Sequence, residues 1–204
     1  MNPLPARTRL STETRQAEIV DAVLDLSDTV GPGAITTVDI ARNLGLTQGA
    51  VFKHFPTKDA IWLAVMGWVE SHLLSALDAV ATAAPTPLEG LQAVFMKHAR
   101  FVAKHPGVPR LIFNELQKPK DTPVKRRARS MQESYRKLLM RLLAEAEKRG
   151  EVAAGLDREG AATLFIGALQ GLMFQAMLAS STAKLEAEAK RVFSLYLNAL
   201  REPS

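Results

Sequence analysis

The fold is decided by residues 36–61, TTVDIARNLGLTQGAVFKHFPTKDAI, in which two short helix-like patterns flank a glycine. The second pattern, at 48–54, is too short to be stable as an isolated helix, so it needs a scaffold. Ala41 is small enough for two helices to approach, Gly45 lies at the turn, and Val51 is expected to face the core. These residue types at these spacings are typical of a helix-turn-helix.

The outward face of the second pattern carries side chains that can read duplex DNA. Gln48 can pair with adenine in the major groove, and Lys53 can reach guanine or a phosphate. Gly49 lets the backbone come close, and the ring of Phe52 can contact a thymine methyl group or the sugar–phosphate edge. The same four residues also suit an ordinary surface on a small helical hairpin, because the pattern alone is only moderately specific.

Helical signals continue along the chain, and no segment shows the alternation of a β-strand. Caps are expected at Thr36 or Thr37, and at Ser181 or Thr182 for the last helix. We predict an all-α fold of about nine helices. Residues 1–57 form a helix-turn-helix domain that extends into the first turn of the fourth helix, and residues 58–204 form a larger helical domain.

Composition excludes several classes of protein. The 204 residues include no cysteine, which excludes disulfides and thiolate metal sites and suits a reducing cytoplasm. No signal-peptide pattern, clustered histidines and carboxylates, phosphate-binding glycine loop or nucleophile motif is present, so we expect neither an enzyme nor a metal or cofactor. The uncharged segment 160–181 is about long enough to span a bilayer, but its glutamines and glycines favour a helix buried on several sides of a soluble protein.

Positive charge is unevenly distributed. The formal net charge is +5, yet residues 1–57 contain five Lys or Arg against six Asp or Glu. Residues 118–150 contain eleven against four, a net +7. The excess therefore lies outside the helix-turn-helix, and an argument for nucleic-acid binding must rest on where side chains are placed.

Residues 15–65 resemble the DNA-binding domain of the TetR family of bacterial transcriptional regulators. The resemblance is carried by an amphipathic first helix, the T-x-x-x-I-A-x-x-x-G-L-T core at 36–47, the aromatic-x-H-F block at 52–55, and Lys58. It covers about the first quarter of the chain, and the remainder matches in helix number and length. It implies a homodimeric cytoplasmic repressor that binds a palindromic operator and releases it when a small molecule binds the C-terminal domain.

The resemblance also implies individual roles. Many members of the family carry tyrosine where this chain has Phe52, so the contact of Phe52 must be apolar here. Arg7, Arg9 and Arg15 either extend the DNA footprint or belong to a solvated N-terminus. Phosphate contacts are implied for Thr37, His54 and Lys58, and positions facing the groove for Thr47, Gln48, Gly49, Phe52 and Lys53.

In the C-terminal domain the resemblance implies a dimer built as a bundle of the last two helices, and a ligand pocket among the fourth to eighth helices. Some interface candidates must also serve the subunit core, and each pocket candidate suits plain core packing as well. The interface candidates are Leu164, Gly167, Gly171, Phe174, Met177, Val192, Phe193 and Tyr196. The pocket candidates are Trp62, Met66, Phe95, Met96, Phe113, Met131, Tyr135, Phe165 and Met173, with His98 as a polar contact.

One alternative keeps this fold and changes the role. The protein could bind DNA constitutively and act through a protein partner that docks on the +7 region at 118–150. A pocket emptied of bulky side chains would favour the ligand-gated regulator, and a filled one would favour the partner.

Overall fold

The computed structural model describes residues 11–31 and 33–201, and every regular element within them is helical. The elements are α1 (Thr12–Thr29), α2 (Thr37–Asn43), α3 (Gln48–His54), α4 (Lys58–Val69), the π-helical η1 (Glu70–Leu74), α5 (Ser75–Ala83), α6 (Pro87–Lys104), α7 (Gly107–Leu116), α8 (Pro123–Lys148), α9 (Arg158–Leu178) and α10 (Leu185–Ala199). Because α4, η1 and α5 run on as a single helix, the described residues form nine helices, which confirms the predicted all-α class.

Side-chain caps start most of these helices. Thr36, rather than Thr37, caps α2: its Oγ1 accepts from the Asp39 N–H at 3.2 Å, and the Asp39 carboxylate accepts from the Thr36 N–H at 2.9 Å. The hydroxyls of Thr47 and Thr57 cap α3 and α4 by accepting from the Ala50 and Ala60 N–H groups. The prediction fails for α10, which begins at Leu185 without a side-chain cap. Its predicted cap Thr182 instead donates to the Ala103 carbonyl at 3.4 Å.

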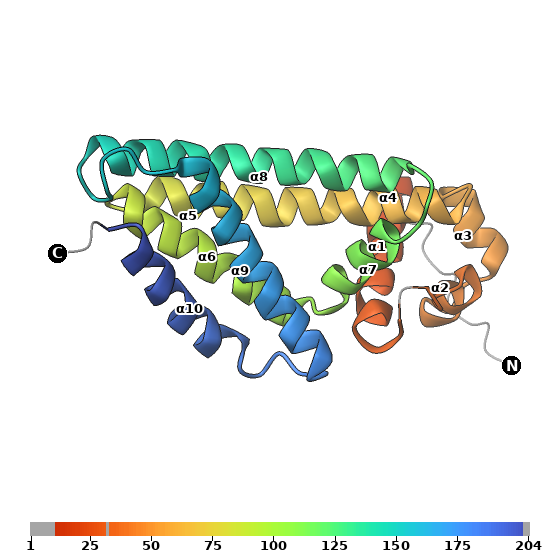
Figure 1. Cartoon of the computed structure of the whole chain (residues 1–204). Coiled ribbons are helices and arrows are strands. Elements are labelled where there is room, and N and C mark those ends of the chain that lie inside the picture. Colours follow the sequence, from red (N-terminus) through yellow and green to blue (C-terminus); the bar gives the residue numbers. More distant parts are fainter. Residues whose placement is uncertain (1–10, 32, 202–204) are drawn as a thin grey trace, which may run out of the picture.

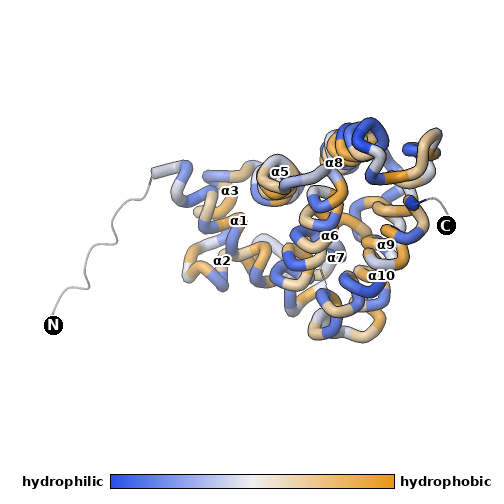
Figure 2. Tube along the Cα trace, turned by 90° about the vertical axis from the view of Figure 1, so that its left-hand side faces the viewer, coloured by the Kyte–Doolittle hydropathy of each residue, from blue (hydrophilic) through white to orange (hydrophobic). Residues whose placement is uncertain are grey.

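Two long helices organise the molecule. The α4–η1–α5 helix and α8 run side by side, with α1, α2 and α3 gathered at one end and α9 and α10 packed toward the other (Figure 1). In the view turned by 90°, the α1–α3 unit lies to one side of α5, and α9 and α10 lie to the other (Figure 2). No linker separates the two parts, because the long helix that begins at Lys58 belongs to both.

Aromatic rings fill the centre of the C-terminal domain. Phe95 of α6 meets Phe165 of α9 edge to face, with ring centroids 5.0 Å apart, and lies 5.4 Å from Phe193 of α10. Tyr196 packs on Phe165 at 5.5 Å, and its hydroxyl donates to the Ala161 carbonyl at 3.2 Å. Each such ring pair adds about 0.5–1.5 kcal/mol beyond the burial of its surface. The cluster therefore joins α6, α9 and α10 into one packed unit.

The C-terminal domain touches the N-terminal unit where α7 starts against the end of α1. The Gly107 N–H donates to the Asp28 carboxylate at 2.8 Å, and Arg110 donates to the Asp28 carbonyl at 3.3 Å. A Cβ on Gly107 would lie 2.0 Å from the hydroxyl oxygen of the buried Ser27. We call this contact between the last turn of α1 and the first turn of α7 the α1–α7 joint; it leaves no room for any side chain at position 107.

Candidate nucleic-acid interface

The turn between α2 and α3 has the geometry that the sequence predicts. Gly45 adopts φ 59°, a left-handed conformation that glycine reaches without steric cost. The Leu46 N–H donates to the Ala41 carbonyl at 2.8 Å, which closes the end of α2. Val51 and Ile40 are fully buried, so the inner face of α3 packs on α2. The outer face of α3 is thereby fixed in orientation.

That outer face presents the predicted reading residues to solvent. Thr47, Gln48, Gly49 and Lys53 are exposed, and the Phe52 ring is 41% exposed. The nearest atom to a Cβ built on Gly49 would be 4.0 Å away, so this part of the helix surface is open to a partner. A large apolar ring beside a lysine and an amide suits contacts with the bases and with the DNA backbone.

Gln48 is linked to another residue of the predicted interface. Its Nε2 donates to the Thr37 hydroxyl at 2.7 Å, which ties the first turn of α3 to the first turn of α2. The side-chain amide of Gln48 has two N–H donors and an acceptor oxygen, so its oxygen and its second N–H remain available to a base. Thr37 is 8% exposed, and its hydroxyl still has its own hydrogen to donate to a phosphate.

His54 and Lys58 are less exposed than their predicted phosphate contacts suggest. His54 is half-buried, its carbonyl accepts from Gln16 at 3.1 Å, and its Nδ1 is buried without a hydrogen-bond partner among the described residues. The Lys58 ammonium lies 5.4 Å from the centre of the Trp62 ring. Burial, and then the charge of Lys118, lower the pKa of Lys58.

The arginines near the N-terminus divide into two groups. Arg7 and Arg9 lie outside the described residues. Arg15 forms an ion pair with Glu18 at 2.5 Å on α1, and its side chain is 15% exposed. In this conformation Arg15 is therefore engaged within α1.

The side chains predicted to line a ligand pocket pack as core. Trp62, Met66, Phe95, Met96, Met131, Tyr135 and Phe165 are all buried, and Phe113 and Met173 are half-buried. Met173 lines a cavity at the C-terminal end of α9. The His98 ring hydrogen-bonds to the Tyr135 hydroxyl at 3.2 Å. Burial lowers the pKa of His98 to about 4, so this pair is neutral at pH 7. The seven buried side chains belong to the packed hydrophobic core of the described residues.

The residues predicted for a dimer interface fall on two faces. Leu164, Gly167, Gly171 and Phe174 are exposed along one stripe of α9. Met177 and Val192 are half-buried. Phe193 and Tyr196 are 3% exposed and belong to the aromatic cluster inside the subunit, so they serve the subunit core.

Two further leucines, which the sequence analysis did not single out, are exposed on α9 and α10. Leu178 of α9 is 67% exposed, and Leu195 of α10 is 70% exposed. The signal for Leu178 is present in the sequence, since it lies seven residues after Gly171 and fourteen after Leu164. We call Leu164, Gly167, Gly171, Phe174 and Leu178 the α9 stripe.

Within one chain the α9 stripe is left uncovered. Only 28% of the most apolar 18-residue window of α9 is buried. By length and composition alone, α9 and the 58–83 helix could cross a membrane, a test that core helices of soluble proteins also pass. An apolar helix face left open on a helix otherwise packed in a core is typical of a protein interface.

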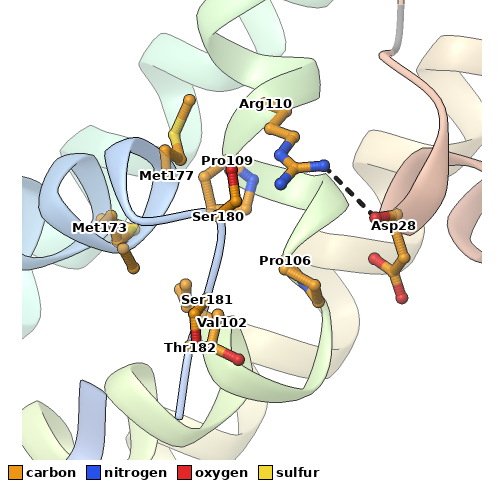
Figure 3. A pocket seen from close by; sticks show the side chains of 11 residues that line it. Asp28, Val102, Pro106, Pro109, Arg110, Met173, Met177, Ser180, Ser181 and Thr182 are labelled. Atoms are coloured by element: carbon orange, nitrogen blue, oxygen red, sulfur yellow. Dashed lines mark hydrogen bonds between the residues drawn. The ribbon is translucent and has the colours of Figure 1, made fainter. Parts of the chain in front are cut away.

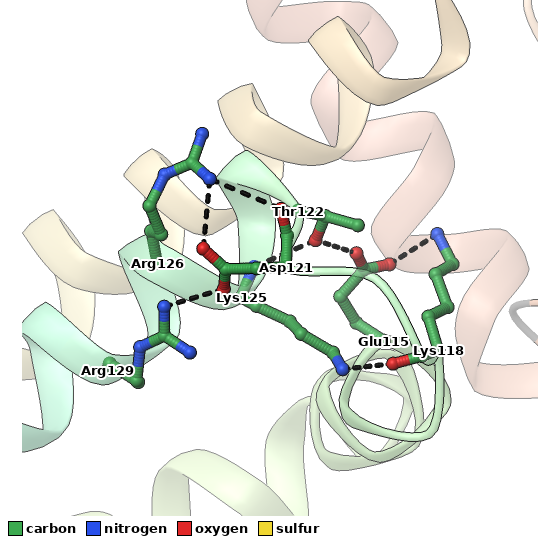
Figure 4. A network of polar contacts seen from close by, with 7 residues as sticks. All are labelled: Glu115, Lys118, Asp121, Thr122, Lys125, Arg126 and Arg129. Carbon is green, nitrogen blue, oxygen red and sulfur yellow. Dashed lines mark hydrogen bonds and ion pairs between the residues drawn. The ribbon is translucent and has the colours of Figure 1, made fainter.

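The basic excess at 118–150 is largely paired within the chain. At the start of α8, Arg126 and Arg129 both contact Asp121, and Lys118 pairs with the buried Glu115 at 2.5 Å (Figure 4). Farther along α8, ion pairs reach other helices: Arg127 with Glu70, Arg136 with Glu159 and Arg141 with Asp78. Within the described residues, no three His, Asp or Glu side chains are grouped to hold a metal ion.

Two family models match the chain. Residues 19–65 match bacterial regulatory proteins of the tetR family, and residues 116–192 match the tetracyclin repressor-like C-terminal domain. The first covers the helix-turn-helix, and the second covers α8, α9 and part of α10. These matches lie in the two regions whose exposed faces are described above.

Known proteins agree with these matches. The nucleoid occlusion factor SlmA of Vibrio atlanticus is 25% identical over 81% of this chain and 84% of its own. A TetR transcription regulator from Haloarcula marismortui superposes with a TM-score of 0.80 at 19% identity, over 93% of this chain and all of that one. FadR of Bacillus subtilis, in complex with stearoyl-CoA, superposes at 0.78 and 19% identity, over 91% of this chain and 99% of that one. The two structures show a shared fold.

Proposed function

This chain belongs to the tetR family of bacterial regulatory proteins, a family of DNA-binding transcriptional regulators and not of enzymes, and we propose that it acts in the cytoplasm as a homodimeric repressor that a small molecule releases from a palindromic operator. The observation that carries the proposal is the exposed face of α3, where Gln48, Phe52 and Lys53 project from a helix capped at Thr47. The scaffold holds this short helix in a position from which it can enter the major groove.

The α9 stripe supports the dimer. Its exposed leucines and phenylalanine lie at helical spacing around two glycines that have open space where a Cβ would be. Two copies of this stripe can approach closely and bury apolar surface on both sides. A dimer would place two copies of α3 about one DNA turn, roughly 34 Å, apart, and would therefore bind a palindromic operator.

Two substitutions distinguish contacts that set overall affinity from contacts that set sequence preference. Lys53→Ala removes one cation, so it should weaken binding to all duplexes by a similar factor and lower the slope of log affinity against log salt by about one. Gln48→Ala removes an amide that can read a base, so it should change sequence preference at one position of each half-site by about 1–3 kcal/mol.

The test is selection from random duplex DNA with the purified chain at one stated salt concentration. Enrichment of a palindrome, lost or altered in Gln48→Ala, is the expected result. The matched control is Lys137→Ala, an exposed lysine on α8 far along the chain from α3. If selection yields no enriched sequence while the protein remains folded, α3 does not read DNA in the manner proposed.

A second candidate is a constitutive DNA-binding protein that acts through a protein partner. It is favoured by the burial of seven of the nine predicted pocket side chains. The pairing of the α8 arginines weakens the 118–150 region as its docking surface. The discriminating measurement adds the low-mass fraction of a cell extract to the protein–operator complex. Release supports the ligand-gated repressor, and unchanged binding supports the second candidate.

A further inference from the structure

A cleft beside the α1–α7 joint belongs neither to the DNA-facing surface nor to the packed hydrophobic core. It encloses about 250 Å³ between the end of α1, the α6–α7 connection and the C-terminal end of α9 (Figure 3). Sites that hold drug-sized ligands enclose about 300–1,000 Å³, so this cleft suits a smaller molecule. The cleft is lined both by the N-terminal unit and by the helix that carries the α9 stripe.

The lining of the cleft combines apolar surface with one cation, Arg110, and one anion, Asp28. Arg110 reaches it from α7, Val102 from α6, and Met173 and Met177 from α9. Flexible thioether side chains adapt to short aliphatic groups. A small molecule with one charged end and one apolar end would match both parts of the lining.

The guanidinium of Arg110 has donors to spare. One N–H donates to the Asp28 carbonyl at 3.3 Å, and Arg110 forms no ion pair with a carboxylate of the described residues. The Asp28 carboxylate instead accepts from the Gly107 N–H, and Figure 3 shows it turned away from the guanidinium. A guanidinium carries five N–H groups in a planar fork that fits a carboxylate with two parallel hydrogen bonds.

Hydroxyl groups lie at the end of α9. Ser180 adopts φ 49°, the one positive φ of a non-glycine residue among those described, and it follows α9 where a helix commonly ends in glycine. Its N–H donates to the Met177 carbonyl at 3.1 Å, which completes the helix end. The side chain of Ser180, with those of Ser181 and Thr182, lines the cleft. Glycine at position 180 would adopt this positive φ without the steric strain that serine has there.

We propose that this cleft binds a small aliphatic monocarboxylate, with the carboxylate held by Arg110 and the serine hydroxyls, and the chain packed on Met173, Met177 and Val102. The regulatory part of this inference rests on the function proposed above. When Arg110 turns toward a bound carboxylate, it breaks its 3.3 Å hydrogen bond to the Asp28 carbonyl and so loosens the α1–α7 joint. Since α1 supports α2 and α3, the ligand favours a different placement of α3 and lowers operator affinity.

Calorimetric titration of the full chain tests the site without DNA. The probes are sodium acetate, butanoate, hexanoate and octanoate, with hexanamide as a neutral molecule of similar shape. We expect one saturable site per chain and a three- to fourfold gain in affinity for each added CH₂ until the cleft is full. Hexanamide should bind at least tenfold more weakly than hexanoate. The absence of saturable binding by every carboxylate would overturn the proposal.

Three variants assign the binding to this cleft. Arg110→Gln should lower hexanoate affinity at least tenfold, and Ala176→Leu should do so by filling the space. Ser180→Gly should raise the melting temperature while weakening hexanoate binding, an outcome that general destabilisation does not give. Arg100→Gln, which changes an exposed arginine of α6 paired with Glu186, is the matched control and should leave affinity unchanged. Equal affinity in the wild type, Ala176→Leu and Ser180→Gly would refute the assignment.

The regulatory step has its own readout. Fluorescence anisotropy of a selected operator, with and without saturating hexanoate, should show at least a tenfold loss of affinity in the wild type and none in Ala176→Leu. Carboxylate binding by a chain that selects no operator would refute the proposed function and leave the site. Operator binding by a chain that takes up no carboxylate would refute the site and leave the function.

Discussion

The α2–α3 unit and the α8–α10 region are both helical, but different interactions fix them. In the α2–α3 unit, caps three residues apart begin each helix, as in Thr36 with Asp39 and Thr47 with Ala50. In the α8–α10 region the helices are held by contacts between distant residues, such as Arg136 with Glu159 and Phe95 with Phe193. Caps also begin α8 and α9, at Thr122 and Asp157, so the comparison teaches that local chemistry starts helices in both regions and that contacts between distant residues set how the α8–α10 helices are arranged.

The largest effect is expected where α9 faces outward. Gly171→Glu places a charge in the α9 stripe, and a charge buried between two copies of this stripe would lack a partner. Sedimentation should show monomers, and operator affinity should fall at least 100-fold. Thr82→Glu, at an exposed position of α5, is the matched control and should remain dimeric. An intact Gly171→Glu dimer would move the interface off the α9 stripe.

The α1–α7 joint connects the two regions and allows a second test. In Gly107→Ala the new Cβ would lie 2.0 Å from the Ser27 Oγ and 2.5 Å from the Ser27 carbonyl carbon, so backbone must move. We expect a loss of about 1–3 kcal/mol in the free energy of unfolding, measured by urea titration. Gly67→Ala in α4 is the control: its Cβ would meet only the end of Arg127 at 3.7 Å, so the variant should be equally stable or more stable. Equal stability of both variants would show that the joint is not tightly packed.

A third test uses the neutral pair inside the C-terminal domain. Burial lowers the pKa of His98 to about 4, whereas an unfolded histidine titrates near 6.5. Between these values the unfolded chain takes up a proton that the folded chain excludes, so the free energy of unfolding should fall by about 1–2 kcal/mol from pH 7.5 to pH 5. His98→Gln keeps a hydrogen-bonding group for Tyr135 and cannot titrate, so its pH dependence should be smaller by that amount. Urea titrations at both pH values measure the difference, and identical slopes in both proteins would contradict the buried neutral histidine.

The smallest effect is expected for a single cap in the α2–α3 unit. Thr36→Ala removes the acceptor of the Asp39 N–H and should cost about 1 kcal/mol of unfolding free energy. Hydrogen bonds from Thr36 also hold the pKa of Asp39 below its ordinary value, so that pKa should rise in the variant. Thr29→Ala, at an exposed position near the end of α1, is the control. A loss no larger than in this control would show that α2 does not depend on its cap.

The same contrast explains what the sequence predicts and what it does not. The Thr36, Thr47 and Thr57 caps, the Gly45 turn and the burial of Val51 follow from residues a few positions apart, and the structure confirms them. The inward position of Phe193 and Tyr196 depends on how α10 meets α6 and α9, and no local pattern distinguishes an inner from an outer aromatic ring.

The sequence also does not predict how the interior is packed or where the cleft lies. An aromatic at helical spacing fits a packed core and a ligand pocket equally well, so only the packing of Phe95 against Phe165 decides between them. The cleft at the α1–α7 joint brings together Asp28, Arg110 and Met177, which lie far apart in the chain. The sequence predicts part of the α9 stripe, because small and apolar residues recur there at heptad spacing.

Hydroxyl-radical footprinting of the full chain on its selected operator tests the central proposal most directly. We expect two protected patches about one helical turn apart and related by the palindrome, with Gly171→Glu protecting neither at the same protein concentration. A single protected patch, or protection that persists unchanged in Gly171→Glu, would contradict a dimer that reads DNA with two copies of α3.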